Sequence, residues 1–289
     1  MHTAHLKIAA GLLATIGCSL AAGPAPVVLG SAKTFAILAN TRVFNTPTSA
    51  ITGDVGVASG NISSLSNFGL VRDASQQFST SAQVNGRVMV GTDDAPTPQL
   101  LAGAAVDMQA AFTDAMGRPG ADFVGLQNGR IVGGNLVPGI YEWTTAVTIA
   151  GDITLTGSST DTWIFQISGS FNQETNMRIT LAGGALPQNV IWAIEGIVTI
   201  GANTLLQGNI LATGNVEVGA NAVHNGCIYA LTTVELNMAT ISCPGGRRGA
   251  SPADDDIHTG MCRNFNSNSV CDRVCDCRVR KFECFDSRR

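Results

Sequence analysis

Apolar and polar residues alternate through the second half of the chain, in a short unit that is written three times. The copies occupy residues 190–208, 209–226 and 227–244, and the last two are 18 residues long each. Each copy holds an apolar-polar-apolar triplet that ends at a glycine or asparagine. The triplets are Val198-Thr199-Ile200, Val216-Glu217-Val218 and Val234-Glu235-Leu236. Short alternating runs with tight corners predict the strands of a β-solenoid, in which one unit forms one coil.

Stacked coils bring equivalent residues into ladders, because parallel strands pair at a spacing of about 4.8 Å. We expect the valines of the triplets to point inward and the middle residues, Thr199, Glu217 and Glu235, to point outward. Beyond the corner, the alignment puts Asn203 beside Asn221 and predicts a second outward ladder. Its members are Thr204, Ala222 and Thr240, continued by Leu206, His224 and Ser242.

The period changes between residues 98 and 118, where apolar residues recur every three or four positions. They are Leu101, Ala104, Ala105, Met108, Ala111, Phe112 and Ala115. This spacing predicts one amphipathic helix, closed by Gly117 and Pro119. Because an apolar stripe must be buried, we expect the helix to cover an outward apolar ladder of the solenoid. That ladder is formed by Trp192, Leu211 and Tyr229.

The segments before the repeat carry a related strand pattern. Residues 27–58 and 121–167 alternate apolar stretches with Asn, Thr, Pro and Gly corners, which indicates further, less regular coils. Several motifs, in order along the chain, resemble those of the secreted ice-binding (antifreeze) protein family of microbes and fungi. They are Leu29-Gly30-Ser31-Ala32 with Phe35-Ala36-Ile37-Leu38-Ala39, Ile51-Thr52-Gly53-Asp54-Val55-Gly56-Val57, Leu136-Val137-Pro138-Gly139-Ile140-Tyr141, Trp163-Ile164-Phe165-Gln166-Ile167 and Gly208-Asn209-Ile210-Leu211-Ala212.

The resemblance covers about residues 28–242. It implies a right-handed β-solenoid of triangular section, with a long helix along one side and with the first and last strands in contact. It also implies adsorption to ice, as the partner, through a flat outer face of small, regularly spaced Thr, Ala, Ser and Asn side chains. The candidate ice-binding residues are Thr148, Thr199, Asn203, Thr204, Asn221, Ala222, Thr240 and Ser242.

Two observations keep a second function open. Glu217 and Glu235 stand where the family commonly has threonine, and stacked carboxylates hold liquid-like hydration and repel each other. Thr and Asn are also good outward strand and corner residues without any ligand. If the ice face is lost, the same fold suits a non-catalytic adhesion or cell-wall-associated module outside the cell.

Catalysis has little support in the sequence. Solenoids also host polysaccharide lyases and hydrolases, and Glu217 and Glu235 resemble the carboxylate pair of glycoside chemistry. No cluster of Lys or Arg accompanies the pair, and the one histidine of residues 24–244, His224, is expected at the surface. An outward ladder also lies on an exposed face of the solenoid rather than in a cleft that could enclose a substrate. We therefore predict no enzyme activity, no metal site and no cofactor.

The N-terminus predicts secretion. Residues 1–23 combine His2, His5 and Lys7 with an apolar run that is too short to span a membrane, as in a cleaved signal peptide. We expect the mature protein to be extracellular and free of the membrane. A lipoprotein signal ending at Cys18 is the alternative. In a secreted chain, the one usable N-glycosylation sequon, at Asn61, becomes available.

Cysteines mark the C-terminal part of the chain. Cys227 and Cys243 bracket the last copy of the repeat and are predicted to form a disulfide, with two buried free thiols as the alternative. Residues 24–244 form the predicted solenoid domain and 245–261 a linker. Residues 262–289 hold five cysteines, which predict a small disulfide-bonded tail, with a zinc site as the alternative. We expect the tail to contact a wall polymer or another chain.

Charge narrows the choice of partners. Residues 24–244 contain 7 Lys and Arg against 14 Asp and Glu. A domain this acidic is unsuited to binding a phosphate backbone, because such binding depends on basic side chains that neutralise phosphates and release their counterions. We therefore predict that the protein does not bind nucleic acid.

Overall fold

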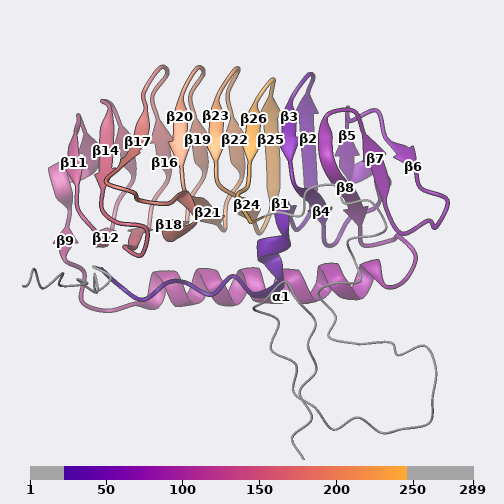
Figure 1. The fold of residues 1–289 in the computed structure, drawn as a ribbon, viewed down its shortest axis with the longest axis horizontal. Helices are drawn as coiled ribbons and strands as arrows, with labels where there is room; N and C mark the ends of the chain where they lie inside the picture. The colour runs from indigo at the N-terminus through magenta and orange to yellow at the C-terminus, as the bar shows by residue number, and fades with distance from the viewer. Residues whose placement is uncertain (1–22, 246–289) are drawn as a thin grey trace, which may run out of the picture. The chain divides into compact units, whose positions relative to one another are not determined.

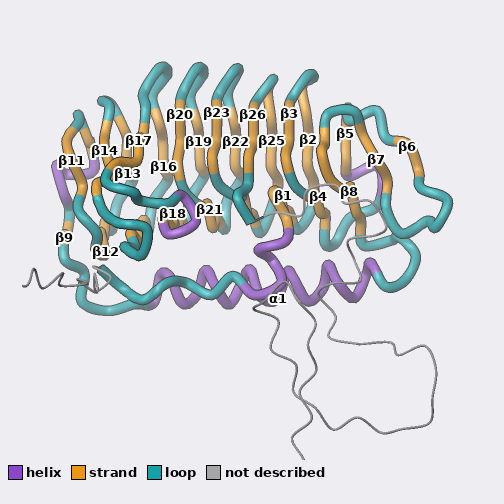
Figure 2. Tube along the Cα trace, viewed as in Figure 1, coloured by secondary structure: helices purple, strands orange, loops and turns teal. Residues whose placement is uncertain are grey.

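The computed structural model describes residues 23–245, which form a three-sided β-solenoid with one long helix along one side (Figure 1, Figure 2). Each complete coil contributes one strand to each side, and strands of neighbouring coils pair in parallel. Alternating short runs build this fold because their apolar residues fill the interior while glycine and asparagine turn the corners. The predicted solenoid with one helix is confirmed.

The helix face consists of nine strands in spatial order. They are β9 (Phe123–Val124), β12 (Gly139–Trp143), β15 (Trp163–Ile167), β18 (Val190–Ile194), β21 (Asn209–Ala212), β24 (Ile228–Ala230), β1 (Phe35–Ala39), β4 (Asp54–Val57) and β8 (Val84–Val90). The second face is formed by the strand that comes next in sequence within each coil. Its strands are β10 (Arg130–Ile131), β13 (Val147–Ile149), β16 (Phe171–Gln173), β19 (Val198–Ile200), β22 (Val216–Val218), β25 (Thr233–Asn237), β2 (Arg42–Thr46) and β5 (Leu65–Ser66).

The third face closes the triangle. Its strands are β11 (Gly134–Leu136), β14 (Ile153–Thr156), β17 (Ile179–Ala182), β20 (Leu205–Gln207), β23 (Val223–Asn225), β26 (Thr240–Ser242) and β3 (Ala50–Thr52), and β3 also pairs with β8. A bridge between Arg178 and Leu205 joins β17 to β20. Four short 3-10 helices lie in connections: η1 (Gly30–Thr34), η2 (Ile62–Ser64), η3 (Leu126–Gly129) and η4 (Pro187–Asn189).

The first coil of the chain docks on the last. On the three faces, Ile37 pairs with Ile228, Val43 with Val234 and Ile51 with Ile241. The N-terminal strands therefore extend the stack beyond its C-terminal coil, and the chain returns to the other end through the helix (Figure 1). The implied contact of first and last strands is confirmed.

Inward ladders form the core. Val198, Val216 and Val234 stack in register and are fully buried, as predicted. Larger rings fill the earlier coils, where the Phe165 and Trp192 rings stack with centroids 3.9 Å apart. Full burial of a large apolar side chain contributes roughly 1.5–3 kcal/mol. Ladders of such residues therefore supply much of the stability of the solenoid.

The predicted helix is α1, which spans Thr97–Gly117 and lies against β8, β15, β18 and β21. Its buried residues include most of the predicted stripe from Leu101 to Ala115. The carboxylate of Asp107 accepts hydrogen bonds from the hydroxyl and the backbone N–H of Ser31, at 2.6 and 2.7 Å, which lower the pKa of Asp107. This contact ties α1 to η1 and the first coil.

The ladder beneath α1 differs from the predicted one by one residue. Trp192 points into the core, where it stacks on Phe165, and it pairs with Ile210 rather than Leu211. Ala193, Leu211 and Tyr229 are in register on the opposite side of these strands, all fully buried under α1. The alignment failed here because it placed Val190 opposite Asn209, whereas the register pairs Ile191 with Asn209, so the first copy is one residue out of step.

A hairpin of β6 (Val71–Arg72) and β7 (Ser79–Ser81) covers one end of the solenoid. β7 pairs in antiparallel fashion with β8, which occupies a backbone edge that a second chain could otherwise bind. Arg72 forms an ion pair with Asp93, and the hydroxyl of Thr97 donates to the carbonyl of Gln77 at 2.7 Å. These contacts connect the hairpin to the start of α1.

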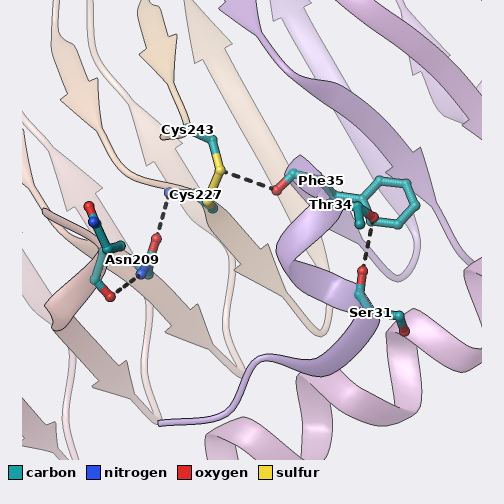
Figure 3. The surroundings of a disulfide bond; sticks show 7 residues. Ser31, Thr34, Phe35, Asn209, Cys227 and Cys243 are labelled. Atoms are coloured by element: carbon teal, nitrogen blue, oxygen red, sulfur yellow. Dashed lines mark hydrogen bonds between the residues drawn. A yellow bond between two sulfur atoms is a disulfide. The ribbon is translucent and has the colours of Figure 1, made fainter. Parts of the chain in front are cut away.

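The predicted disulfide between Cys227 and Cys243 is present and joins the beginning of β24 to the end of β26 (Figure 3). The side-chain oxygen of Asn209 accepts a hydrogen bond from the Cys227 N–H at 3.0 Å. Other predictions lie outside the described residues: the leader and Cys18 before Gly23, and the linker, tail and alternative zinc site after Gly245. Among the residues that are described, no helix is long and apolar enough to cross a membrane.

Candidate functional site

The predicted second outward ladder is wrong at four positions, because Thr204, Ala222, Leu206 and His224 are all buried. Thr204 and Ala222 are 1% and 0% exposed, and the Thr204 hydroxyl donates to the carbonyl of Gly201 at 2.9 Å. The last corner is one residue shorter than the corner before it, because Leu236 is in register with Val218 and Thr240 with Val223. Thr240 is consequently exposed on the third face, followed by the half-buried Ser242.

The corner asparagines form a ladder between the second and third faces. Asn176, Asn203 and Asn221 are exposed and adopt left-handed backbone conformations, with φ of 68°, 58° and 57°. The amide of Asn203 donates to the side-chain oxygen of Asn176, and that of Asn221 to Asn203, each at 3.4 Å. Asparagine tolerates this conformation better than most residues, which explains its use at each corner.

The second face presents a central outward row along the whole stack. Thr148, Asn172 and Thr199 are in register on β13, β16 and β19, and each is half-buried. They are flanked mostly by small or uncharged residues in the same coils. The uncharged flanking residues are Ala146, Ala150, Ser170, Ile197 and Gly201. The remaining flanking residue is Glu174, which forms an ion pair at 2.8 Å with Arg130, the residue in register with Thr148 at the end of the row. This half of the face combines hydroxyl, amide and methyl groups at the pitch of the coils.

The other half of the second face is charged and uneven. Glu217 and Glu235 continue the row in register and are both exposed. They line a shallow depression of about 280 Å³, together with Phe44, Asn237 and the β19 residues Thr199 and Ile200. The guanidinium of Arg42 lies over the Phe44 ring, 5.4 Å from its centroid. Flat contact with a solid is therefore poorer here than on β13 and β16.

The third face also carries small polar residues, including Thr154, Thr180 and Ser242. Longer connections leave its border with the helix face, at residues 157–162 and 183–189. The corners of the second face between β13 and β25 have only two to five residues. The second face is therefore the side with the fewest projecting segments across these coils.

The expectation that His224 lies at the surface is wrong. Its side chain is 0% exposed and points inward between Leu206 and Ile241. Burial lowers the pKa of His224 to about 4, so the ring is neutral near pH 7. In the described part of the chain, no group of three His, Cys, Asp or Glu residues is placed to hold a metal ion.

The architecture defines a class of protein. A rigid three-sided stack, one side covered by a helix and another left flat with a regular outward row, suits binding to an extended surface. The depression beside Glu217 and Glu235 is shallow and open, so it does not enclose a ligand. The fold and site therefore belong to surface-binding solenoids.

Comparison with known proteins narrows this class to one family. Residues 37–242 match the family model described as ice-binding-like, and the chain belongs to that family. An ice-binding protein of Flammulina populicola is 45% identical over 230 residues, which cover 80% of this chain and 93% of that protein. Ice-binding protein K3-B1 of Typhula ishikariensis is 43% identical over 208 residues, covering 71% and 86% of the two chains.

A solved structure supports the same assignment. The crystal structure of a glycosylated ice-binding protein from an Arctic yeast superimposes with a TM-score of 0.75 at 36% sequence identity. The match covers 76% of this chain and 94% of that one. The family resemblance seen in the sequence motifs is thus confirmed over nearly the whole described solenoid.

Proposed function

We propose that the protein adsorbs to ice outside the cell and inhibits the growth or recrystallisation of ice crystals. The observation that carries the proposal is the uncharged row Thr148, Asn172 and Thr199, presented by three coils on a side without long connections. The relatives named above are ice-binding proteins, and the ice-binding-like family model matches residues 37–242, which include these coils.

Adsorption to a solid needs many weak contacts that act together. Each hydroxyl or amide holds water only weakly, but residues fixed on one rigid scaffold engage without further loss of freedom. Each row residue lies between two inward residues of its own strand. For Thr199 these are Val198 and Ile200, which are almost fully buried. This rigidity supports simultaneous contact with an ordered water lattice.

The contact surface that we propose is centred on β13, β16 and β19 and bordered by Asn203 and Asn221. Thr204 and Ala222 are excluded because they are buried. Thr240 and Ser242 belong to the third face, which is the competing candidate surface. Glu217 and Glu235 limit the proposed surface at its other side.

The proposed location is extracellular, and the proposed role is not catalytic. A disulfide such as Cys227–Cys243 persists in oxidising compartments, which agrees with the leader predicted for residues 1–23. Contact of residues 262–289 with a wall polymer or another chain stays a prediction.

A single ice crystal observed in purified protein tests both function and surface. We expect faceted growth and a freezing point below the melting point. Thr199→Tyr should abolish most of this activity, because a bulky ring spoils the flatness of the second face. Thr240→Tyr is the matched control, since it adds the same ring to the third face. Circular dichroism melting should show that both variants remain folded.

The outcomes separate the alternatives. Loss of activity in Thr240→Tyr alone would move the contact to the third face. Smooth disc-shaped growth in concentrated wild-type protein would refute ice adsorption. Binding to isolated cell-wall polymer in that same preparation would then favour the adhesion module.

A further inference from the structure

The segment between β4 and β5 contains the only Asn-x-Ser/Thr sequon of the chain. Its residues Asn61, Ile62 and Ser63 are all exposed. They form the start of η2, at the corner between the helix face and the second face. An enzyme or a bulky substituent can therefore reach this site without displacing the core.

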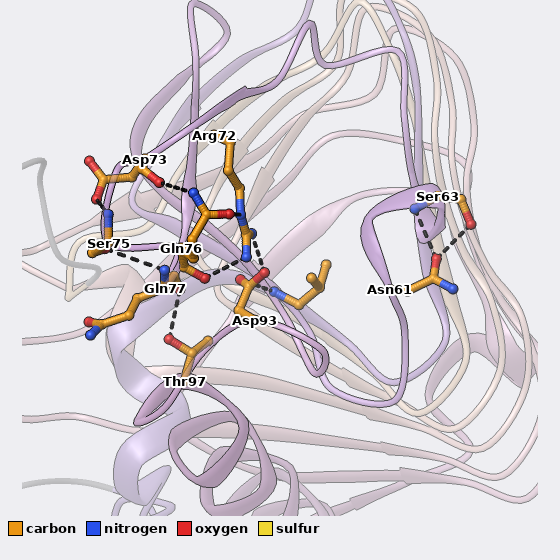
Figure 4. Close-up of polar contacts among 10 residues, drawn as sticks. Asn61, Ser63, Arg72, Asp73, Ser75, Gln76, Gln77, Asp93 and Thr97 are labelled. Atoms are coloured by element: carbon orange, nitrogen blue, oxygen red, sulfur yellow. Dashed lines mark hydrogen bonds and ion pairs between the residues drawn. The ribbon is translucent and has the colours of Figure 1, made fainter.

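The geometry of the side chain leaves its nitrogen free for reaction. The Asn61 oxygen accepts hydrogen bonds from the Ser63 N–H at 2.9 Å and from the Ser63 hydroxyl at 2.6 Å. Figure 4 shows the amide nitrogen of Asn61 turned away from Ser63. The Ser64 hydroxyl accepts from the Asn61 backbone N–H at 3.3 Å and holds the turn.

We propose that Asn61 is N-glycosylated, an inference that rests on the proposed export of the chain. The donor would be an oligosaccharide linked to a lipid through pyrophosphate. A bond forms between the Asn61 amide nitrogen and the anomeric carbon of the first sugar, and the nitrogen loses one proton. The bond from that carbon to the pyrophosphate breaks, and the lipid pyrophosphate leaves.

The folded protein can carry this glycan and keep its ice-contacting row free. β5 is the end strand of the second face and lies four strand positions from β19. At the spacing of parallel strands this is about 19 Å. Thr148 and Asn172 lie farther still, on β13 and β16. The glycan should therefore add bulk at one end of the stack and leave ice adsorption unchanged.

The test is expression of the full chain in a secreting yeast, followed by gel mobility before and after endoglycosidase treatment. We expect wild type to shift on treatment and Asn61→Gln to migrate at the treated position from the start. Ser63→Ala should behave like Asn61→Gln, whereas Ser63→Thr preserves the sequon and should keep the shift. Ser64→Ala is the matched control, because it weakens the same turn and leaves the sequon intact.

Mass spectrometry of the peptide that contains residue 61 decides the outcome. A glycan on Asn61 that is lost in Ser63→Ala and retained in Ser64→Ala supports the proposal. Wild-type protein with an unmodified Asn61, whether secreted or retained, overturns it. Ice-crystal assays of wild type and Asn61→Gln should agree within about twofold, since the site is remote from the contact row. Because the glycan is detected by mass, its presence can be judged even if the protein has no ice activity.

Discussion

Single positions decide whether a residue of this chain meets solvent or the core. A solenoid strand alternates inward and outward residues, so a shift of one position turns a proposed contact residue into a core residue. Thr204 shows the effect, since its neighbour Asn203 is exposed while Thr204 itself is 1% exposed. The orientation of a residue therefore depends on corner length as much as on residue type.

His224 should make stability depend on pH. Its folded-state pKa, about 4, is below the ordinary value of 6.5, so between these values the unfolded chain binds more protons than the folded one. The stability that depends on neutral His224 is fully present above pH 6.5 and is lost as the pH falls to about 4. The free energy of unfolding should fall by about 3 kcal/mol over this range. Denaturant unfolding at pH 7 and pH 4 measures the loss.

His224→Leu is the variant that isolates this effect, because leucine matches the inward residues Leu206 and Ile241 on either side. The variant should lose about 3 kcal/mol less than wild type between the two pH values. An equal loss in both proteins would show that other groups account for the pH dependence.

At the scale of elements, the docking of α1 on the helix face depends on the close approach of the Leu101 side chain to Gly56 of β4. A β-carbon at that position would lie 2.8 Å from side-chain atoms of Leu101 and Phe35. Gly56→Ala should therefore destabilise the protein by about 1–3 kcal/mol, as overpacking does in other cores. Gly103→Ala is the control, because a β-carbon added there would have no neighbouring atom within 4 Å and alanine favours a helix by up to about 1 kcal/mol.

The second face also permits a gain of activity. Glu217→Thr combined with Glu235→Thr should extend the uncharged row from three coils to five. We expect the gap between melting and freezing points to grow by about twofold or more, because more contacts act together. Glu142→Gln with Asp94→Asn removes the same charge elsewhere and should leave the gap unchanged. An equal gain in that control would point to net charge rather than to the face.

Sequence patterns predicted the secondary-structure elements well, but they predicted the register of residues between neighbouring coils less well. The valine ladder, the helix and the disulfide follow from periodicity and spacing, which act within a few residues. The Trp192 error and the placing of Thr240 beside Thr204 both come from a shift of one residue between copies of the repeat. The burial of Thr204 and Ala222 depends instead on how the corner turns. The smoothness of the second face could not be predicted either, because it depends on where long connections leave distant coils.

For the molecule as a whole, the disulfide stabilises the coil on which the N-terminal coil docks. Closing a loop of this size is worth about 3 kcal/mol in the chain-entropy model. Cys227→Ser combined with Cys243→Ser should lower the free energy of unfolding by about that amount, measured with denaturant. Because neighbouring coils share their ladders, unfolding should remain a single transition. A separate early transition would show that the N-terminal coils unfold alone.

The order of the coils has a consequence for synthesis. β1, β2 and β3 pair on one side with β4, β5 and β8, but their partners on the other side, β24, β25 and β26, are the last strands to be made, so one edge of the first coils stays open until then. We expect the first ninety or so residues to stay sensitive to protease in a chain truncated after residue 226, and to become resistant in one that extends to residue 245. The open edge of the first coils would thus be covered only once the end of the solenoid domain has been made.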